Sequence, residues 1–226
     1  MGKVTILPET TKNPITLIGK RAGICWGADI ADDEKNFARG IDCIESGHGR
    51  TLEFPNIEMV LEGYSARVIR EWYTHIGGAP TRLQASTRYI DYSNFPCITP
   101  KSVTRNSKAQ YIYDDALEYL RSAIVQLSDL GIPREDTAYL LTLGMETVVV
   151  DKRNVRNLID MSRNRECTRA LWEFRDLFND ICNALRAYSP EWGYFVDTQF
   201  MPKCEMLGYC HEKKSCGRKP KKVSKA

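Results

Sequence analysis

The sequence Gln84-Ala85-Ser86-Thr87-Arg88-Tyr89 lies within a polar stretch of the chain, residues 81–100. This stretch contains many hydroxyl, amide and guanidinium groups but no regular apolar spacing, which favours a contact-making loop over a core element. The Arg88 guanidinium and the Ser86 hydroxyl are donors of the type that bind a phosphate group. Taken alone, the same residues are also typical of an ordinary polar surface loop.

The segment before this loop contains both strands and helices. Gly77-Gly78-Ala79-Pro80 ends a helix that Ser65 caps, because two glycines and a proline do not continue a helix cheaply. The rough alternation of apolar and polar residues over Leu52–Leu61 predicts a half-buried strand. The elements expected nearer the N-terminus are one strand and two helices: Val4–Leu7, Pro14–Trp26 and Asp32–Ser46.

The segment after the loop is chiefly helical. Apolar residues at helical spacing predict a long helix over Ala109–Leu130, which Gly131 ends. A further helix, a short strand and two more helices are expected after it: Pro133–Leu143, Thr147–Val150, Arg153–Asn164 and Thr168–Tyr188. Few strands, separated by many helices, indicate the α+β class with a small central sheet.

Composition restricts the classes of protein to which the chain can belong. Its 226 residues are 42% hydrophobic and 27% charged, enough for a substantial core. The formal charge of +3 is too mild to indicate a nucleic-acid partner. Since neither a long apolar run nor a signal-peptide pattern is present, we expect a cytoplasmic protein with no membrane partner. In that compartment Cys25, Cys43, Cys97 and Cys182 are expected to be reduced and packed as small hydrophobes.

Four motifs occur in the order and spacing of flavin-dependent thymidylate synthases. His48 precedes the predicted strand and helix, and His75 stands near the end of that helix, where the family has Arg-His-Arg. The four motifs come after these histidines: Gln84–Tyr89, Leu141–Thr147, Asn154–Leu158, and Arg165 ahead of Trp172-Glu173. The chain resembles this family over roughly residues 3–195. The resemblance implies its α+β fold over residues 1–200, followed by a basic, cysteine-containing tail over 201–226.

The resemblance also implies an activity and the residues that carry it. The expected reaction is the reductive methylation of dUMP to dTMP, with bound FAD, methylenetetrahydrofolate as carbon donor and NADPH as reductant. Arg165 is the expected catalytic residue, because it could stabilise negative charge on the uracil ring. The other substrate-binding residues implied are Glu71, Gln84, Ala85, Ser86, Thr87 and Arg88. The cofactor-binding residues implied are His48, Glu53, His75, Arg82, Asn154 and Arg156, in a homotetramer whose sites form between subunits.

The chain departs from the family pattern at the flavin motif. Thr74 and Ile76 flank His75 in place of two arginines, and an arginine that the family places before the Leu141–Thr147 turn falls on Ala138. Arg82 could restore one charge, and Gly77-Gly78 could let backbone N–H groups approach a phosphate. Two alternatives therefore stay open: a related flavin-dependent transferase with another pyrimidine substrate, and a nucleotide-binding homologue without catalysis.

The tail contains three cysteines and a histidine close together. A tetrahedral zinc site has four ligands, and the tail offers four candidates: Cys204, Cys210, His211 and Cys216. However, the tail contains no Cys-x-x-Cys pair, and adjacent residues such as Cys210 and His211 are awkward as simultaneous ligands. Packed or redox-active thiols are the preferred interpretation, with no metal expected, and zinc is the weaker one.

Overall fold

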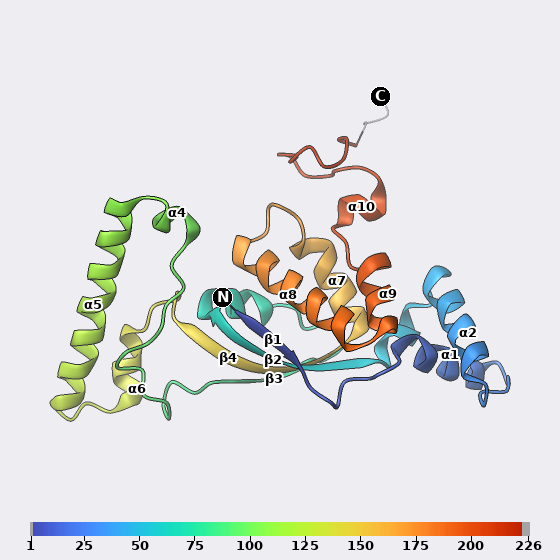
Figure 1. Ribbon diagram of the computed structural model, residues 1–226, viewed down its shortest axis with the longest axis horizontal. Coiled ribbons are helices and arrows are strands. Elements are labelled where there is room, and N and C mark those ends of the chain that lie inside the picture. The colour runs from blue at the N-terminus through green and yellow to red at the C-terminus, as the bar shows by residue number, and fades with distance from the viewer. Residues whose placement is uncertain (1, 223–226) are drawn as a thin grey trace.

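The computed structural model describes residues 2–222 as a small antiparallel sheet with helices over one face and at both ends (Figure 1). The strand order is β1-β2-β4-β3, and every neighbouring pair is antiparallel. The strands are β1 (Lys3–Ile6), β2 (Asn56–Ser65), β3 (Thr81–Gln84) and β4 (Glu146–Asn154). The fold class is α+β, as the sequence predicts.

Ten α-helices and two short 3₁₀ segments are present in the described residues. The first half contains α1 (Pro14–Cys25), α2 (Asp33–Glu45), η1 (Gly49–Glu53), α3 (Ala66–Trp72) and α4 (Lys101–Thr104). The second half contains α5 (Ser107–Asp129), α6 (Arg134–Thr137), η2 (Ala138–Leu140), α7 (Val155–Arg165), α8 (Trp172–Tyr188), α9 (Pro190–Thr198) and α10 (Lys203–Leu207).

The main core lies between the sheet and the helices α7, α8 and α9 (Figure 1). Alternate residues of β2, such as Ile57, Met59 and Leu61, are fully buried and belong to the same cluster as Phe174 and Phe178 of α8. Each fully buried side chain of this size contributes about 1.5–3 kcal/mol to folding. The pattern follows from the period of two along a strand with one face buried.

Helices α1 and α2 form a closely packed pair at one end of the sheet (Figure 1). A Cβ atom at Gly19 would overlap the carbonyl oxygen of Asn36, and one at Gly40 would overlap the carbonyl oxygen of Ile15. Glycine is therefore required at both positions for the two backbones to approach. Asp32 starts α2, because its carboxylate accepts hydrogen bonds from the backbone N–H groups of Glu34 and Lys35.

An arm built from α4, α5 and α6 extends from the other end of the sheet (Figure 1). It has a small core of its own, in which four side chains are buried: Phe95, Leu117, Ile124 and Met145. Several large apolar side chains remain exposed on it, including Tyr111, Tyr119 and Tyr139. The arm is thus a second, weaker packing unit beside the main core.

Some elements differ from the sequence-based predictions. Strand β2 begins four residues later than predicted, because Gly49–Glu53 forms a 3₁₀ turn before it. The segment expected to be loop throughout includes β3, and the helix expected over Pro133–Leu143 is only α6 followed by η2. Helix α9 was not predicted. Cys25 is exposed, whereas Cys43 and Cys182 are buried as expected and Cys97 is partly buried.

Candidate active site

Arg165, at the end of α7, brings together residues from two distant parts of the chain. Its Nη1 donates to Oε2 of Glu71 at 2.7 Å, and its Nε donates to Nε2 of His75 at 2.9 Å. Its guanidinium group also stacks on the Phe174 ring, 4.8 Å from the centroid. Three residues predicted to act in one site, Glu71, His75 and Arg165, therefore lie in direct contact. We call them the Arg165 cluster.

The Arg165 contact fixes the charge state of His75. A guanidinium group has only donors, so the Nε2 atom of His75 must accept and its ring proton must lie on Nδ1. Burial and the positive charges of Arg165 and Arg153 lower the pKa of His75 to about 4. The Glu71 carboxylate accepts a hydrogen bond from the same guanidinium group. His75 is therefore neutral at physiological pH and serves as an acceptor for Arg165.

This lowered pKa predicts a pH-dependent stability. Between pH 6.5 and about 4 the unfolded chain protonates His75 and the folded chain does not, so folding weakens as the pH falls. Allowing for the partial exposure of the ring, we expect about 1–2 kcal/mol more loss between pH 7 and 4.5 in the wild type than in His75→Gln. Urea unfolding of both proteins at each pH measures the difference.

Comparison with this variant removes the contributions of other groups. Burial raises the pKa of Glu166 to about 7, which makes folding weaken as the pH rises from 4.5 to 7, the opposite direction. Glu166 is present in both proteins, so its effect cancels in the difference. Glutamine keeps an acceptor for Arg165 but does not titrate. Identical pH dependence of the two proteins would contradict a neutral, buried His75.

A groove beside the Arg165 cluster has the size of a ligand site. Its volume is about 450 Å³, and its lining residues are Arg67, Arg70, Glu71, Thr74 and Leu143. Small-molecule sites usually enclose about 300–1,000 Å³. Two arginines from successive turns of α3 give this groove the charge that an anionic ligand requires.

The Gln84–Tyr89 segment continues from β3 on the other side of β4. The backbone N–H of Ala85 donates to the carbonyl oxygen of Val148 at 2.9 Å, and Gln84 Nε2 donates to Thr147 Oγ1 at 3.3 Å. Ser86 Oγ accepts from the backbone N–H of Arg88 at 3.2 Å. The Arg88 side chain is exposed, and within residues 2–222 no carboxylate forms an ion pair with it. Arg88 is therefore available to an external anion.

Arg88 does not line the groove beside the Arg165 cluster. It lines a separate hollow of about 310 Å³ with Tyr89, Pro133, Arg134 and Glu135. The single chain thus distributes the predicted substrate residues over two places.

The predicted cofactor residues lie mostly near the start of α7. Arg156 Nη1 forms an ion pair with Glu53 Oε1 at 2.5 Å, and Asn154 caps α7 by accepting from the backbone N–H of Asn157. His48 is exposed and meets the Trp26 ring edge-on at 6.3 Å. Arg82 donates to the carbonyl oxygen of Tyr73 at 3.0 Å, and its guanidinium group stacks on the Tyr73 ring. Of these residues, Asn154 lies directly against the turn that contains Gly77 and Gly78.

Comparisons with known proteins identify the family. The sequence model described as "Thymidylate synthase complementing protein" matches residues 6–191, which is most of the chain. The chain belongs to the flavin-dependent thymidylate synthase family. A curated member from Nitratidesulfovibrio vulgaris is 27% identical, covering 98% of this chain and 97% of that protein. One from Geobacter sulfurreducens is 28% identical, covering 83% and 84% respectively.

A solved structure of a family member shows the same fold. The flavin-dependent thymidylate synthase from Helicobacter pylori, complexed with FAD and dUMP, superposes with a TM-score of 0.68 at 20% identity. The match covers 88% of this chain and 99% of that one. The four motifs read from the sequence thus correctly predict both the family and the fold.

A buried ion pair near the site was not predicted from the sequence. Arg153 and Asp151, on β4, have fully buried side chains, with Nε and Oδ2 2.6 Å apart. Trp72 Nε1 donates to Asp151 Oδ1 at 2.9 Å, and the Arg153 guanidinium stacks on the Trp72 ring. The signal was the period of two along β4, which places Asp151 and Arg153 on the same buried face as Val149.

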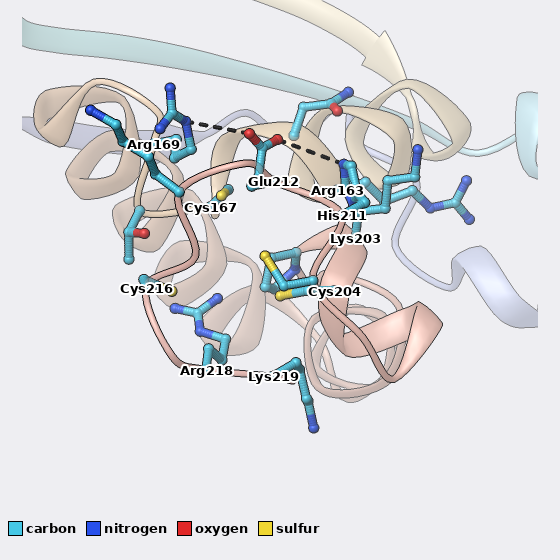
Figure 2. Close-up of a pocket in the computed structure, with 15 residues that line it drawn as sticks. Arg163, Cys167, Arg169, Lys203, Cys204, His211, Glu212, Cys216, Arg218 and Lys219 are labelled. Carbon is cyan, nitrogen blue, oxygen red and sulfur yellow. Dashed lines mark ion pairs between the residues drawn. The ribbon is translucent and has the colours of Figure 1, made fainter. Parts of the chain in front are cut away.

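The C-terminal tail encloses a cavity against the end of α7 and the loop after it (Figure 2). The suggested zinc ligands Cys204, Cys210, His211 and Cys216 all line it, together with Cys167. In residues 2–222, however, no three His, Cys, Asp or Glu side chains form a group that could hold a metal ion. Glu212 instead pairs with Arg169 at 3.4 Å and approaches His211 at 3.6 Å (Figure 2).

None of the helices described in residues 2–222 has both the length and the apolar character needed to cross a membrane.

Proposed function

We propose that this chain is a flavin-dependent thymidylate synthase that converts dUMP to dTMP, with methylenetetrahydrofolate as carbon donor and NADPH as reductant. The observation that carries the proposal is the Arg165 cluster, in which the catalytic candidate of the family contacts Glu71 and His75. Family membership and the FAD and dUMP bound to the Helicobacter pylori enzyme support it.

The residues at the turn after α3 fit a flavin nucleotide. Within the described residues, the backbone N–H groups of Gly77 and Gly78 donate to no protein acceptor, so they are available to phosphate oxygens. Arg82 and Arg156 add positive charge, and His48 and Asn154 add polar contacts. Bound in its reduced form, FAD would supply the hydride for the methyl group.

The chain's own residues bind and polarise the substrate. Arg88 and Ser86 hold the nucleotide phosphate by charge-assisted hydrogen bonds. Gln84 orients the sugar, and Ala85 and Thr87 provide the surrounding backbone. Arg165 donates to the uracil edge and stabilises negative charge there as C5 becomes nucleophilic. The neutral His75 and the Glu71 carboxylate hold the guanidinium in place.

A homotetramer would unite the two places that the single chain keeps apart. The family resemblance implies sites that form between subunits, and in our proposal the Arg88 hollow of one subunit faces the Arg165 groove of another. Support comes from large apolar side chains exposed on the arm, among them Tyr111 at 72%, Ile112 at 68% and Tyr119 at 76%.

We place this enzyme in the cytoplasm, in agreement with eight free cysteines. We assign the synthase to residues 1–200 and regard residues 201–226 as an appended tail.

The test uses the purified full chain, first without and then with added FAD. We expect a yellow protein that forms dTMP from dUMP, methylenetetrahydrofolate and NADPH. Failure to bind flavin under any condition would refute the proposal. Flavin binding with turnover of another pyrimidine nucleotide would favour a related transferase, and flavin binding without any turnover would favour a non-catalytic homologue.

Replacing Arg88 with alanine tests the phosphate site. Loss of a charge-assisted hydrogen bond should weaken dUMP binding by about 1.5–3 kcal/mol while FAD binding is retained. Isothermal titration with dUMP measures the change. Arg105→Ala is the matched control, because Arg105 is also an exposed arginine but lies at the end of α4. Unchanged dUMP affinity in Arg88→Ala would remove Arg88 from the site.

A further inference from the structure

The turn His75–Ala79 has a conformation that its own sequence does not favour. Gly78 and Ala79 both adopt left-handed backbone angles, with φ of 74° and 51°. Such a conformation strains an alanine, and it persists only where neighbouring groups hold it. Ile76 is 69% exposed, so apolar burial contributes little to holding the turn. Contacts from another element must fix it.

Helix α7 supplies these contacts through Asn157. The side-chain Nδ2 of Asn157 donates to the carbonyl oxygen of Gly77 at 2.7 Å and lies 3.5 Å from that of His75. A Cβ atom at Gly78 would overlap the Asn154 side-chain amide, so the turn packs directly on the first turn of α7. The backbone of the His75–Ala79 turn is thus tied to one helix end.

The buried ion pair determines which way the Asn157 amide faces. Arg153 Nη1 donates to Asn157 Oδ1 at 2.5 Å. Because a guanidinium group cannot accept, the oxygen of Asn157 must face Arg153 and the NH₂ group must face the turn. Arg153 is itself held in place, because it donates two hydrogen bonds to Asp151 and stacks on the Trp72 ring. The donor that meets Gly77 is therefore preorganised by groups with almost no solvent exposure.

We infer that Asn157, oriented by Arg153, is a positioning residue that seats the His75–Ala79 turn on α7 and so sets where His75 meets Arg165. Thr74 and Ile76 flank this histidine. The contacts of Asn157 with the backbone of the turn therefore replace contacts that side chains of the turn itself could make. The part of the inference that concerns flavin rests on the proposed function. The part that concerns the placement of His75 does not.

Two substitutions at Asn157 separate its two hydrogen bonds. Asn157→Asp keeps an acceptor for Arg153 but removes the donor to Gly77, and Asn157→Ala removes both. We expect the pKa of His75, measured by NMR on a chain with three histidines, to rise from about 4 towards 6.5 in both variants. We expect FAD affinity to fall about tenfold in both. Asn179→Ala, at an exposed asparagine of α8, should change neither quantity.

The outcomes distinguish this inference from the proposed function. A wild-type pKa of His75 in folded Asn157→Asp would overturn the inference, whatever the enzyme binds. A wild-type chain that binds no FAD would refute the proposed function but leave the pKa measurement decisive. If neither Asn157 variant folds, Gly78→Ala provides the test, because its Cβ pushes the turn off α7 and leaves Asn157 intact. An unchanged pKa of His75 in that variant would also overturn the inference.

Discussion

Replacing Arg165 with alanine should reduce dTMP formation by about 10²–10³-fold, which is the usual loss when one preorganised donor to a developing negative charge is removed. The guanidinium group is held by Glu71 and His75 before substrate arrives, so it needs little reorganisation during the reaction. The effect should appear in kcat, since the proposed phosphate ligands Arg88 and Ser86 are unchanged. Rates of dTMP formation at saturating dUMP measure it.

Structural damage is not expected to explain this loss. The Arg165 and Glu71 side chains are 22% and 33% exposed, so the freed carboxylate can be solvated. Arg163→Ala is the matched control, because Arg163 lies on the same helix and pairs with the exposed Asp160. The control should keep wild-type turnover. An Arg165→Ala enzyme within threefold of the wild type would exclude Arg165 from catalysis.

Replacing Arg153 with methionine should cost about 3–5 kcal/mol of unfolding free energy, because it leaves the buried Asp151 carboxylate without its ion partner. Only the Trp72 indole N–H would remain as a side-chain donor to that carboxylate. Domains of this kind are stable by only about 5–15 kcal/mol, so the variant should unfold at a much lower urea concentration. Urea titration followed by tryptophan fluorescence measures the change.

A double variant tests whether the lost charge pairing is the cause. Asp151→Asn combined with Arg153→Met removes both charges, and it should be more stable than Arg153→Met alone. If the double variant is the less stable of the two, the cost arises from packing around Trp72 instead of from an uncompensated charge. Both proteins retain Arg165 and the Gln84–Tyr89 segment.

The sequence predicts best those elements whose burial is periodic. Helices α1, α2, α5 and α8 match their predicted ranges to within about four residues, because each presents one apolar stripe to the protein. Strand β3 was missed, since it is a short edge strand with Leu83 72% exposed and is defined by pairing with β4. None of its four residues is buried, so no alternation of apolar and polar residues marks this strand in the sequence.

For the candidate site, too, the sequence predicts some features and only the fold shows the others. Motif order makes Glu71, His75 and Arg165 candidates, but only the fold shows that these side chains touch. The sequence predicts that Arg153 begins a helix, whereas it lies on β4 with its side chain fully buried. Its carboxylate partner Asp151 lies two residues earlier on the same strand, but its aromatic neighbour Trp72 comes from α3. The contact between these distant parts of the chain is what local reasoning could not supply.

The arm formed by α4, α5 and α6 divides the chain into two thermodynamic units. Its core of four buried side chains is far smaller than the core between the sheet and the helices α7, α8 and α9. The free energy of local opening follows the apolar area that a segment buries, so the amide protons of α5 should exchange with solvent while the sheet stays closed. The boundary between fast and slow exchange should fall near Met145, directly before β4. A second subunit docked on α5 would slow that exchange without changing the global unfolding of the sheet.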